Sequence, residues 1–381
     1  MKSKCKLGDI ISQRREKYNG ENLPICGVTR DGFIPPKQKD ADLSLYNVFY
    51  KDDFVFNPAR MELNAIVFND IYEKAICSSL YEIFYVSKPD IVLPSFLALL
   101  VKQAWFTRYC EFLGSGSARE YCRVVNISEI EIEYPDLDEQ RRIVNEYDVI
   151  RNRIALKRRI NDNLEAIAQS VFQEQFASFY RSDELPNGYS FAGLDSICTV
   201  KGGKRLPADC ELLDTPTKHP YIRVRDVGNS RYVCLTDQFQ YIDEETHSAI
   251  SRYIVNTDDI IISIVGTIGL LGKIHSSLDN ANLTENCVKL TNIHTVTSDY
   301  LYYTLCYKKQ AKEIELLTVG AVQAKLPIYN IQSIKILVPP KEAIEDFQNK
   351  LNVLNEQIEA NTIEINKLYE LQSLFLAKLS D

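Results

Sequence analysis

The strongest constraint on this chain is an internal repeat. Residues 116–135 align without a gap with residues 320–339, at an offset of 204 residues. Within the alignment, Asn126 falls on Asn330 and is followed in both copies by an isoleucine. Both copies predict a loop, then a short strand of alternating apolar residues, then a proline that ends the strand. The chain therefore contains two copies of one unit.

A heptad pattern follows each copy at the same offset. Apolar residues after Pro339 recur at steps of three and four, which predicts a long helix with an a/d seam, and a second seam follows Pro135 in matching register. Each predicted helix has on the order of 35–40 residues and is roughly 55 Å long. Polar residues interrupt the seams at Asn361 and at Lys157 with Asn161, which is typical of helices that pair in a fixed register.

A weaker repeat precedes these segments. Residues 50–56 resemble residues 256–262, and residues 7–10 resemble residues 194–197, so loops of different length separate shared strands. Many short strands bounded by Gly, Pro and Asn indicate globular parts of the α/β (α+β) class, with helices near 95–112 and 298–317.

The expected fold is two α/β (α+β) domains separated by two long antiparallel coiled-coil helices, with a pseudo-twofold internal repeat. The predicted boundaries are 1–136 for the first globular domain, 137–180 for the first long helix, 181–340 for the second globular domain and 341–381 for the second long helix.

Antiparallel pairing of the helices would carry one domain to each end of the pair. Duplex DNA also has twofold backbone symmetry, and two separated domains can engage two grooves on one face. Because the two domains differ in their loops, the expected target is split and asymmetric, with an unread spacer. At about 3.4 Å per base pair, a helix of roughly 55 Å spans on the order of sixteen pairs.

The net charge of −8 argues against a DNA-binding protein unless the charge is unevenly distributed. Residues 341–381 hold four basic and eight acidic side chains, whereas residues 1–39 hold nine basic and four acidic ones. Residues 201–231 are basic as well, with seven against four. DNA binding depends on where the basic groups lie, so the two globular parts stay candidates.

Cysteine usage indicates the compartment. The ten cysteines are scattered singly, without CxxC or paired histidine spacing, which predicts core thiols rather than a zinc site or a disulfide framework. A reducing cytoplasm is the expected location. The sequence also has no apolar run of the length that a membrane span or a secretory signal needs.

Four segments are similar in order and sequence to those of one known family: 51–61, 135–144, 259–269 and 320–326. The second contains Pro-Asp-Leu-Asp-Glu-Gln-Arg-Arg-Ile, similar to the pattern Pro-x-Leu-x-Glu-Gln-x-x-Ile that opens a long helix in that family. Through these segments the chain resembles the specificity (S) subunits of type I restriction–modification systems over nearly its whole length. The second predicted helix departs from the pattern, because residues 341–347 lack the Glu-Gln pair.

The resemblance implies two target recognition domains that read a bipartite, asymmetric site in double-stranded DNA. It also implies two methyltransferase (M) subunits docked on the long helices. Methyl transfer and S-adenosylmethionine binding would then belong to those partners, with no cofactor in this chain. Whether a restriction (R) motor-nuclease subunit joins the complex, or whether an orphan complex only methylates, stays open.

No catalytic motif emerges from the residues. Asn57-Pro58-Ala59-Arg60 lacks the second proline and the aromatic ring with which amino-methyltransferases hold a flipped base. Residues 114–119 are not a Walker loop, because no Gly-Lys-Ser/Thr follows. The four histidines show no metal-ligand spacing. We therefore predict a non-catalytic chain without a metal.

Candidate DNA contacts are exposed basic or amide side chains in loops. One group follows the first strand of the first domain, and another occupies the equivalent place in the second. Two arginines alternate on a strand-like run and could contact guanine edges; the remainder lie in turns and in the repeated loops. The set comprises Arg14, Arg15, Lys17, Arg60, Arg119, Lys201, Lys204, Arg205, Arg223, Arg225, Gln323 and Lys325. Each of these alone is more typical of a solvated surface charge, but as a set they favour DNA contact.

Two other classes of function stay open. The heptads and the acidic charge also suit an interaction scaffold whose domains bind protein rather than DNA. An enzyme with an unrecognised active site is the second alternative.

Overall fold

The computed structural model describes residues 2–29, 32–36, 42–114, 121–228, 230–310, 312–320 and 324–379. The chain forms two compact units. Unit 1 comprises Met1–Arg153 with Tyr369–Asp381, and unit 2 comprises Ile154–Leu368. Each of two long helices therefore contributes a segment to both units.

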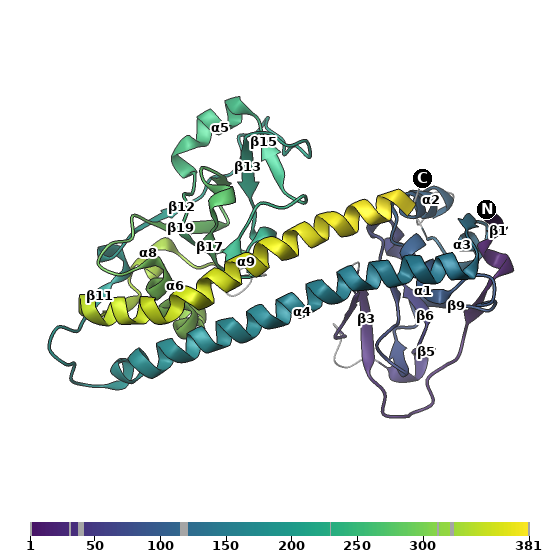
Figure 1. Cartoon of the computed structure of the whole chain (residues 1–381), viewed down its shortest axis with the longest axis horizontal. Coiled ribbons are helices and arrows are strands. Elements are labelled where there is room, and N and C mark those ends of the chain that lie inside the picture. The colour runs from purple at the N-terminus through teal and green to yellow at the C-terminus, as the bar shows by residue number, and fades with distance from the viewer. Residues whose placement is uncertain are drawn as a thin grey trace. The chain divides into compact units, whose positions relative to one another are not determined.

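These helices are α4, Leu137–Phe176, and α9, Lys341–Leu379, which Figure 1 draws as long continuous ribbons in teal and yellow. Within unit 2 they run antiparallel. Lys157 contacts Glu364 at 2.9 Å, whereas Gln175, later in α4, contacts Asp346, earlier in α9, at 2.6 Å. The structure confirms the two long antiparallel helices that the heptads predict.

The internal repeat is visible in the helix pairing of unit 2. Lys157 donates a hydrogen bond of 2.8 Å to the side-chain oxygen of Asn361, and these two residues are 204 positions apart. That separation equals the offset of the sequence repeat. Equivalent residues that contact one another lie beside a local twofold axis, so the pseudo-twofold prediction is confirmed for the helix pair.

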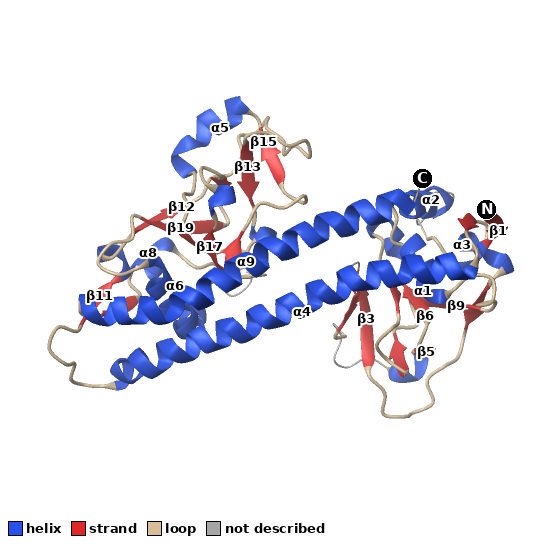
Figure 2. Cartoon of the chain, viewed as in Figure 1, coloured by secondary structure: helices blue, strands red, loops and turns tan. Residues whose placement is uncertain are grey.

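Among the described residues, unit 1 contains three small sheets with strand orders β1-β10, β2-β9-β6-β7 and β4-β3-β8-β5. Figure 2 draws the strands in red. The strands of unit 1 are β1 Ser3–Lys6, β2 Ile11–Arg14, β3 Ile25–Thr29, β4 Gly32–Ile34, β5 Asn47–Tyr50, β6 Asp53–Phe56, β7 Ile66–Phe68, β8 Lys74–Cys77, β9 Glu82–Val86 and β10 Glu131–Tyr134. Its shorter helices are η1 Leu7–Asp9, η2 Leu43–Leu45, η3 Pro58–Leu63, α1 Pro94–Leu100, α2 Ala104–Gly114 and α3 Val124–Ile127.

Unit 2 repeats this plan with sheets ordered β11-β20, β12-β19-β16-β17-β14 and β15-β13-β18. Its strands are β11 Ser190–Gly193, β12 Thr199–Gly202, β13 His219–Ile222, β14 Tyr232–Val233, β15 Gln240–Ile242, β16 Ile260–Ser263, β17 Leu271–Ile274, β18 Asn282–Leu283, β19 Cys287–Thr291 and β20 Lys335–Val338. Its shorter helices are η4 Ala177–Arg181, η5 Leu194–Ser196, η6 Val224–Asp226, α5 Glu244–Ile250, η7 Ser251–Tyr253, η8 Ser276–Leu278, α6 Ser298–Gln310, α7 Glu313–Leu316 and α8 Ile328–Gln332.

Corresponding elements of the two units lie at the offsets that the sequence predicts. Strand β10 pairs antiparallel with β1, and β20 pairs antiparallel with β11. Both β20 and α8 begin 204 residues after β10 and α3, and η5 begins 187 residues after η1. The weaker repeat is therefore a true structural repeat.

A repeated turn precedes β6 and β16. Asp52 and Asp258 adopt left-handed backbone angles, with φ of 65° and 68°. The next carboxylate in each copy, Asp53 or Asp259, accepts a hydrogen bond from the backbone N–H three residues earlier, at 2.7 and 2.9 Å. Aspartate tolerates this conformation and closes such turns, which explains the Asp-Asp pair of both segments.

Each unit packs its own stretch of α4 and α9 into its core. In unit 1, Tyr147 of α4 lies against Phe375 of α9, with ring centroids 6.0 Å apart. In unit 2, Phe172 and Phe176 of α4 pack with Phe347 of α9. Burial of such aromatic side chains stabilises each unit by about 1.5–3 kcal/mol per residue.

Local details differ from the sequence prediction. The helix expected near 95–112 is interrupted at residues 101–103 and forms α1 and α2, and the helix near 298–317 divides into α6 and α7. The repeated loop leads into a short helix, α3 or α8, before its strand begins. Apolar periodicity marks the buried face of these segments but does not resolve short breaks.

The Glu-Gln pair of the first long helix has a structural role. Gln140 is buried, accepts a hydrogen bond from Leu93 N–H and donates to the carbonyl oxygens of Ile91 and Pro135. The equivalent position of the second helix is Ile344, which lies in the apolar core of unit 2. An apolar contact therefore replaces the amide network at the second helix start.

In the part of the chain that the structure describes, every helix is too short or too polar to cross a bilayer.

Candidate nucleic-acid interface

Arg14 lies at the end of β2 and is part of the fold of unit 1. Its guanidinium forms a bidentate pair with Asp53, at 2.6 and 2.9 Å, and lies over the rings of Tyr50 and Tyr85. Asp53 is buried, and burial raises the pKa of its carboxyl even though Arg14 opposes this shift. Removing Arg14 would leave a buried acid without its partner.

Arg15 and Lys17 follow on the exposed side of the chain. Arg15 donates to the amide oxygen of Gln13, and Lys17 donates to Asn47 and to the carbonyl of Leu45. Both side chains are exposed and can exchange these neutral partners for phosphate oxygens. Of the three predicted residues in this segment, these two are accessible to DNA.

The corresponding segment of unit 2 carries Lys201, Lys204 and Arg205, all exposed. Lys204 lies 5.8 Å from the centre of the Tyr253 ring, and Arg205 pairs with Glu285 at 2.7 Å. Lys201 lies near the end of β12, and Lys204 and Arg205 follow that strand.

Gly203, between these cations, lies where two backbone segments of unit 2 pack closely. A Cβ atom at this position would lie 2.0 Å from the carbonyl oxygen of Thr284. Only glycine, which has no side chain, permits this close approach.

The prediction that Arg223 and Arg225 alternate on a strand is wrong. Strand β13 ends at Ile222, and Arg225 lies in the 3-10 helix η6. Arg223 precedes that helix and is held by Asp226, Gln240 and the carbonyl oxygen of Gln238. Its polar partners end the strand and fix its guanidinium, whereas Arg225 stays exposed.

The remaining predicted contacts lie in turns and in the repeated loops. Arg60, in η3, and Lys325, beside Val319, are both exposed. Arg119 and Gln323 lie outside the described residues. Among the predicted contacts, Arg15, Lys17, Arg60, Lys201, Lys204, Arg205, Arg225 and Lys325 are exposed, whereas Arg14 and Arg223 are held by partners within the fold.

A buried ion cluster in unit 2 was missed by the sequence analysis. Arg231 donates to Asp299, to Tyr303 and to Asn355, while Lys273 lies 2.7 Å from the same carboxylate of Asp299. Burial disfavours the charged carboxylate, but Arg231 and Lys273 hold the pKa of Asp299 below its usual value. Nothing in the sequence distinguishes Arg231 from a surface arginine, because its partners are far away along the chain.

Two buried cysteines of unit 2 have the environment of core thiols. Burial raises the pKa of the Cys198 and Cys287 thiols to about 12, which keeps both protonated at neutral pH. His219 and His247 stack at 3.8 Å, and His219 contacts Glu244 at 2.8 Å. Among the described residues, no three acidic, histidine or cysteine side chains form a cluster fit for a metal ion.

Comparison with known proteins identifies what this arrangement is similar to. The family model described as "Type I restriction modification DNA specificity domain" matches residues 4–166 and 186–372. The chain is 24% identical over 310 residues to the type I restriction enzyme MjaIX specificity subunit of Methanocaldococcus jannaschii, covering 76% of this chain and 69% of the relative. It is 23% identical over 430 residues to the HindI specificity subunit of Haemophilus influenzae, covering 93% and 90%.

The fold is also similar to a solved structure. The S subunit of a type I restriction–modification system from M. genitalium superposes with a TM-score of 0.54 at 16% sequence identity. The superposition covers 100% of this chain and 96% of the other. At this identity the likeness concerns the fold alone.

Proposed function

Because the chain belongs to the type I restriction modification DNA specificity family, we propose that its two units read the two halves of a split, asymmetric DNA site. As a specificity subunit it determines DNA target recognition and is a non-catalytic part of a type I restriction enzyme. The family resemblance inferred from the sequence is thereby confirmed.

Recognition of a two-part target is supported by the structural repeat, in which two related units have different loops. The two units share β1-β10 and β11-β20 pairings, but their main sheets have four and five strands. Each unit also presents a different set of exposed cations. Two related but unequal units fit two different half-sites on one duplex.

The long helices would set the spacer between the half-sites. Helix α4 has 40 residues, which corresponds to about 60 Å at roughly 1.5 Å per residue. At about 3.4 Å per base pair, that length limits the spacer to fewer than about eighteen pairs. We keep 137–180 and 341–381 as the spacer helices and 1–136 and 181–340 as the reading domains.

Assignment to this family also suggests partner subunits and a cellular location. Two methyltransferase (M) subunits would dock on α4 and α9, bind S-adenosylmethionine and transfer the methyl group, and a restriction (R) subunit would complete a cleaving complex. The ten free cysteines support a reducing, cytoplasmic location.

An electrophoretic shift assay tests DNA recognition. The chain, assembled with its methyltransferase partners, is mixed with a pool of random duplexes, and the shifted DNA is sequenced. We expect enrichment of one gapped motif that depends on the chain. Partner assembly without enrichment would instead favour the protein scaffold, and methylation or cleavage by the isolated chain would indicate an enzyme.

The cation cluster of unit 2 offers a second test. Replacing Lys201, Lys204 and Arg205 together with glutamine should weaken duplex binding and flatten its salt dependence, because each lost phosphate contact lowers the slope by about 0.9. An unchanged salt slope in the assembled complex would refute this role.

A further inference from the structure

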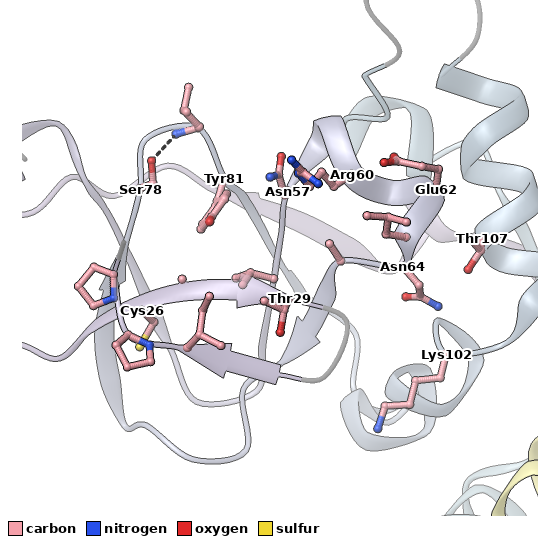
Figure 3. Close-up of a pocket in the computed structure, with 18 of the residues that line it drawn as sticks. Cys26, Thr29, Asn57, Arg60, Glu62, Asn64, Ser78, Tyr81, Lys102 and Thr107 are labelled. Carbon is pink, nitrogen blue, oxygen red and sulfur yellow. Dashed lines mark hydrogen bonds between the residues drawn. The ribbon is translucent and has the colours of Figure 1, made fainter. Parts of the chain in front are cut away.

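Unit 1 contains a recess of about 980 Å³ that the sequence analysis did not single out. Residues of β3, η3 and α2 line it, as do the turn between β8 and β9 and the residues that follow β4 (Figure 3). Three cationic side chains belong to its lining: Arg60 of η3, Lys102 between α1 and α2, and Arg108 of α2. Glu62 is the single carboxylate among the lining residues.

The two arginines of the recess have no polar partner among the described residues. Arg60 and Arg108 are exposed, and neither side chain forms an ion pair or hydrogen bond within the described residues. Arg14, by contrast, is paired with a buried carboxylate, and Arg123 lies 3.8 Å from Glu82. An arginine without a partner among the described residues keeps its five donors for a ligand.

Apolar and aromatic side chains also line the recess. Pro35, Pro36, Leu80 and Tyr81 contribute to it, and Leu80 is 77% exposed. The backbone N–H of Leu80 donates to the Ser78 hydroxyl, the dashed line in Figure 3, which holds the turn that presents this leucine. A recess lined by an exposed leucine and by cations without partners among the described residues fits a ligand that has both an apolar surface and negative charge.

We propose that this recess holds the sugar–phosphate backbone of one DNA strand, with Arg60 and Arg108 on phosphates and the Leu80 wall against deoxyribose. The proposal rests on the DNA-reading function of the units and names where unit 1 contacts the strand. The cations come from two separate elements, η3 and α2, and line an open recess. That arrangement suits successive phosphates of a strand better than one small anion.

The DNA contacts of unit 1 then differ from those predicted from the sequence. Arg60 remains a contact, and Lys102 and Arg108 are further contacts. Arg14 is excluded, because its guanidinium pairs with the buried carboxylate of Asp53. Lys102 lies 5.6 Å from the centre of the Tyr147 ring of α4, within unit 1. Backbone contacts of this kind position the protein on the duplex and leave the base sequence to other side chains.

The test uses the assembled complex and a duplex that carries its target. The double variant R60Q/R108Q should bind roughly tenfold more weakly near physiological salt, and its log–log salt slope should fall by about 1.8. The charge-matched control K51Q/K88Q alters exposed lysines of unit 1 outside the recess and should keep the wild-type slope. The single variant R108Q should lower the slope by about 0.9, and it serves if the double variant fails to fold.

Three outcomes would overturn the proposal. One is a wild-type slope for R60Q/R108Q or an equal loss in the control. Another is displacement of the duplex by millimolar inorganic phosphate at constant ionic strength, which would indicate a small-anion site. The third is loss of partner assembly with DNA affinity retained, which would indicate an acidic protein segment. Failure of the wild-type complex to select any duplex would instead refute the proposed function.

Discussion

Arg231, Lys273 and Asp299 meet in the interior of unit 2, where ions are costly to bury. Their partners come from both long helices and from the globular part: Asn355 and Gln348 of α9, and Tyr303 of α6, which also bonds Glu165 of α4. The cluster therefore ties the sheet-bearing part of unit 2 to its helix pair. The hydrogen bonds and ion pairs of the cluster form together in one arrangement of the sheets and helices of unit 2. The cluster therefore fixes how these parts are oriented within the unit, as well as adding stability.

Replacing Arg231 with methionine should destabilise unit 2 by about 3–5 kcal/mol, because Asp299 loses its main partner while still buried. The matched control is Arg225→Met, whose side chain is 65% exposed and should change stability by less than about 0.5 kcal/mol. Urea unfolding of the full chain, monitored by circular dichroism, measures both. Similar midpoints for the two variants would show that the buried cluster does not hold unit 2 together.

Glu165 makes the stability of unit 2 depend on pH. Burial raises the pKa of its carboxyl, against the attraction of Arg231, and its Oε1 has no hydrogen-bond partner among the described residues. A raised pKa means that the folded protein holds this proton more tightly than the unfolded chain. The resulting stabilisation is complete below the ordinary glutamate pKa and is lost as pH rises through the folded value.

Glu165→Gln should therefore leave stability almost unchanged in acid and make unit 2 more stable than wild type at neutral pH. Its amide oxygen still accepts the hydrogen bond of 3.0 Å from Tyr303. Unfolding free energies across this pH range measure the difference, with exposed Glu174→Gln as the control on the same helix. A difference that shrinks as pH rises would contradict the assignment.

At the scale of elements, the helix pair has a polar centre in unit 2. Asn361 donates to the side-chain oxygen of Asn161 at 2.8 Å, and Asn161 donates to Thr362 and to the carbonyl of Ile358. These asparagines are buried within an otherwise apolar seam. Buried polar residues of a coiled coil fix its register at a cost in stability.

A double-mutant cycle separates the two effects. Asn161→Leu or Asn361→Leu alone should cost about 1–3 kcal/mol, because the remaining buried amide loses the hydrogen bond between the two asparagines. The double variant should cost less than the sum of the single variants and come near wild-type stability. Additive losses would show that the two amides act independently, and the thermal or urea midpoint of each variant provides the data.

At the scale of the whole molecule, period and repetition made the fold predictable. The heptads predicted α4 and α9, and the offset of 204 residues predicted the equivalent β10 and β20 strands. These elements could be predicted because a helix seam and a strand pattern depend on local apolar spacing. Short breaks such as residues 101–103 leave the apolar spacing intact, so the sequence pattern did not predict them.

The candidate site was less predictable, for a physical reason. Whether a cation is free can depend on a partner distant in sequence. Arg14 pairs with Asp53, which lies 39 positions away, while Arg108 pairs with nothing in the described chain. Composition and spacing count charges but do not reveal their partners. Structure therefore decides which basic residues remain available for DNA.

If this chain makes its complex read two separated half-sites, the modified bases of the host genome should lie in one gapped motif. Mapping these bases, with the chain present and with its gene deleted, measures this. We expect one asymmetric motif in two parts, separated by fewer than about eighteen unread base pairs, and its disappearance on deletion. An uninterrupted motif, or a modification pattern unchanged by the deletion, would refute two-part recognition by this chain.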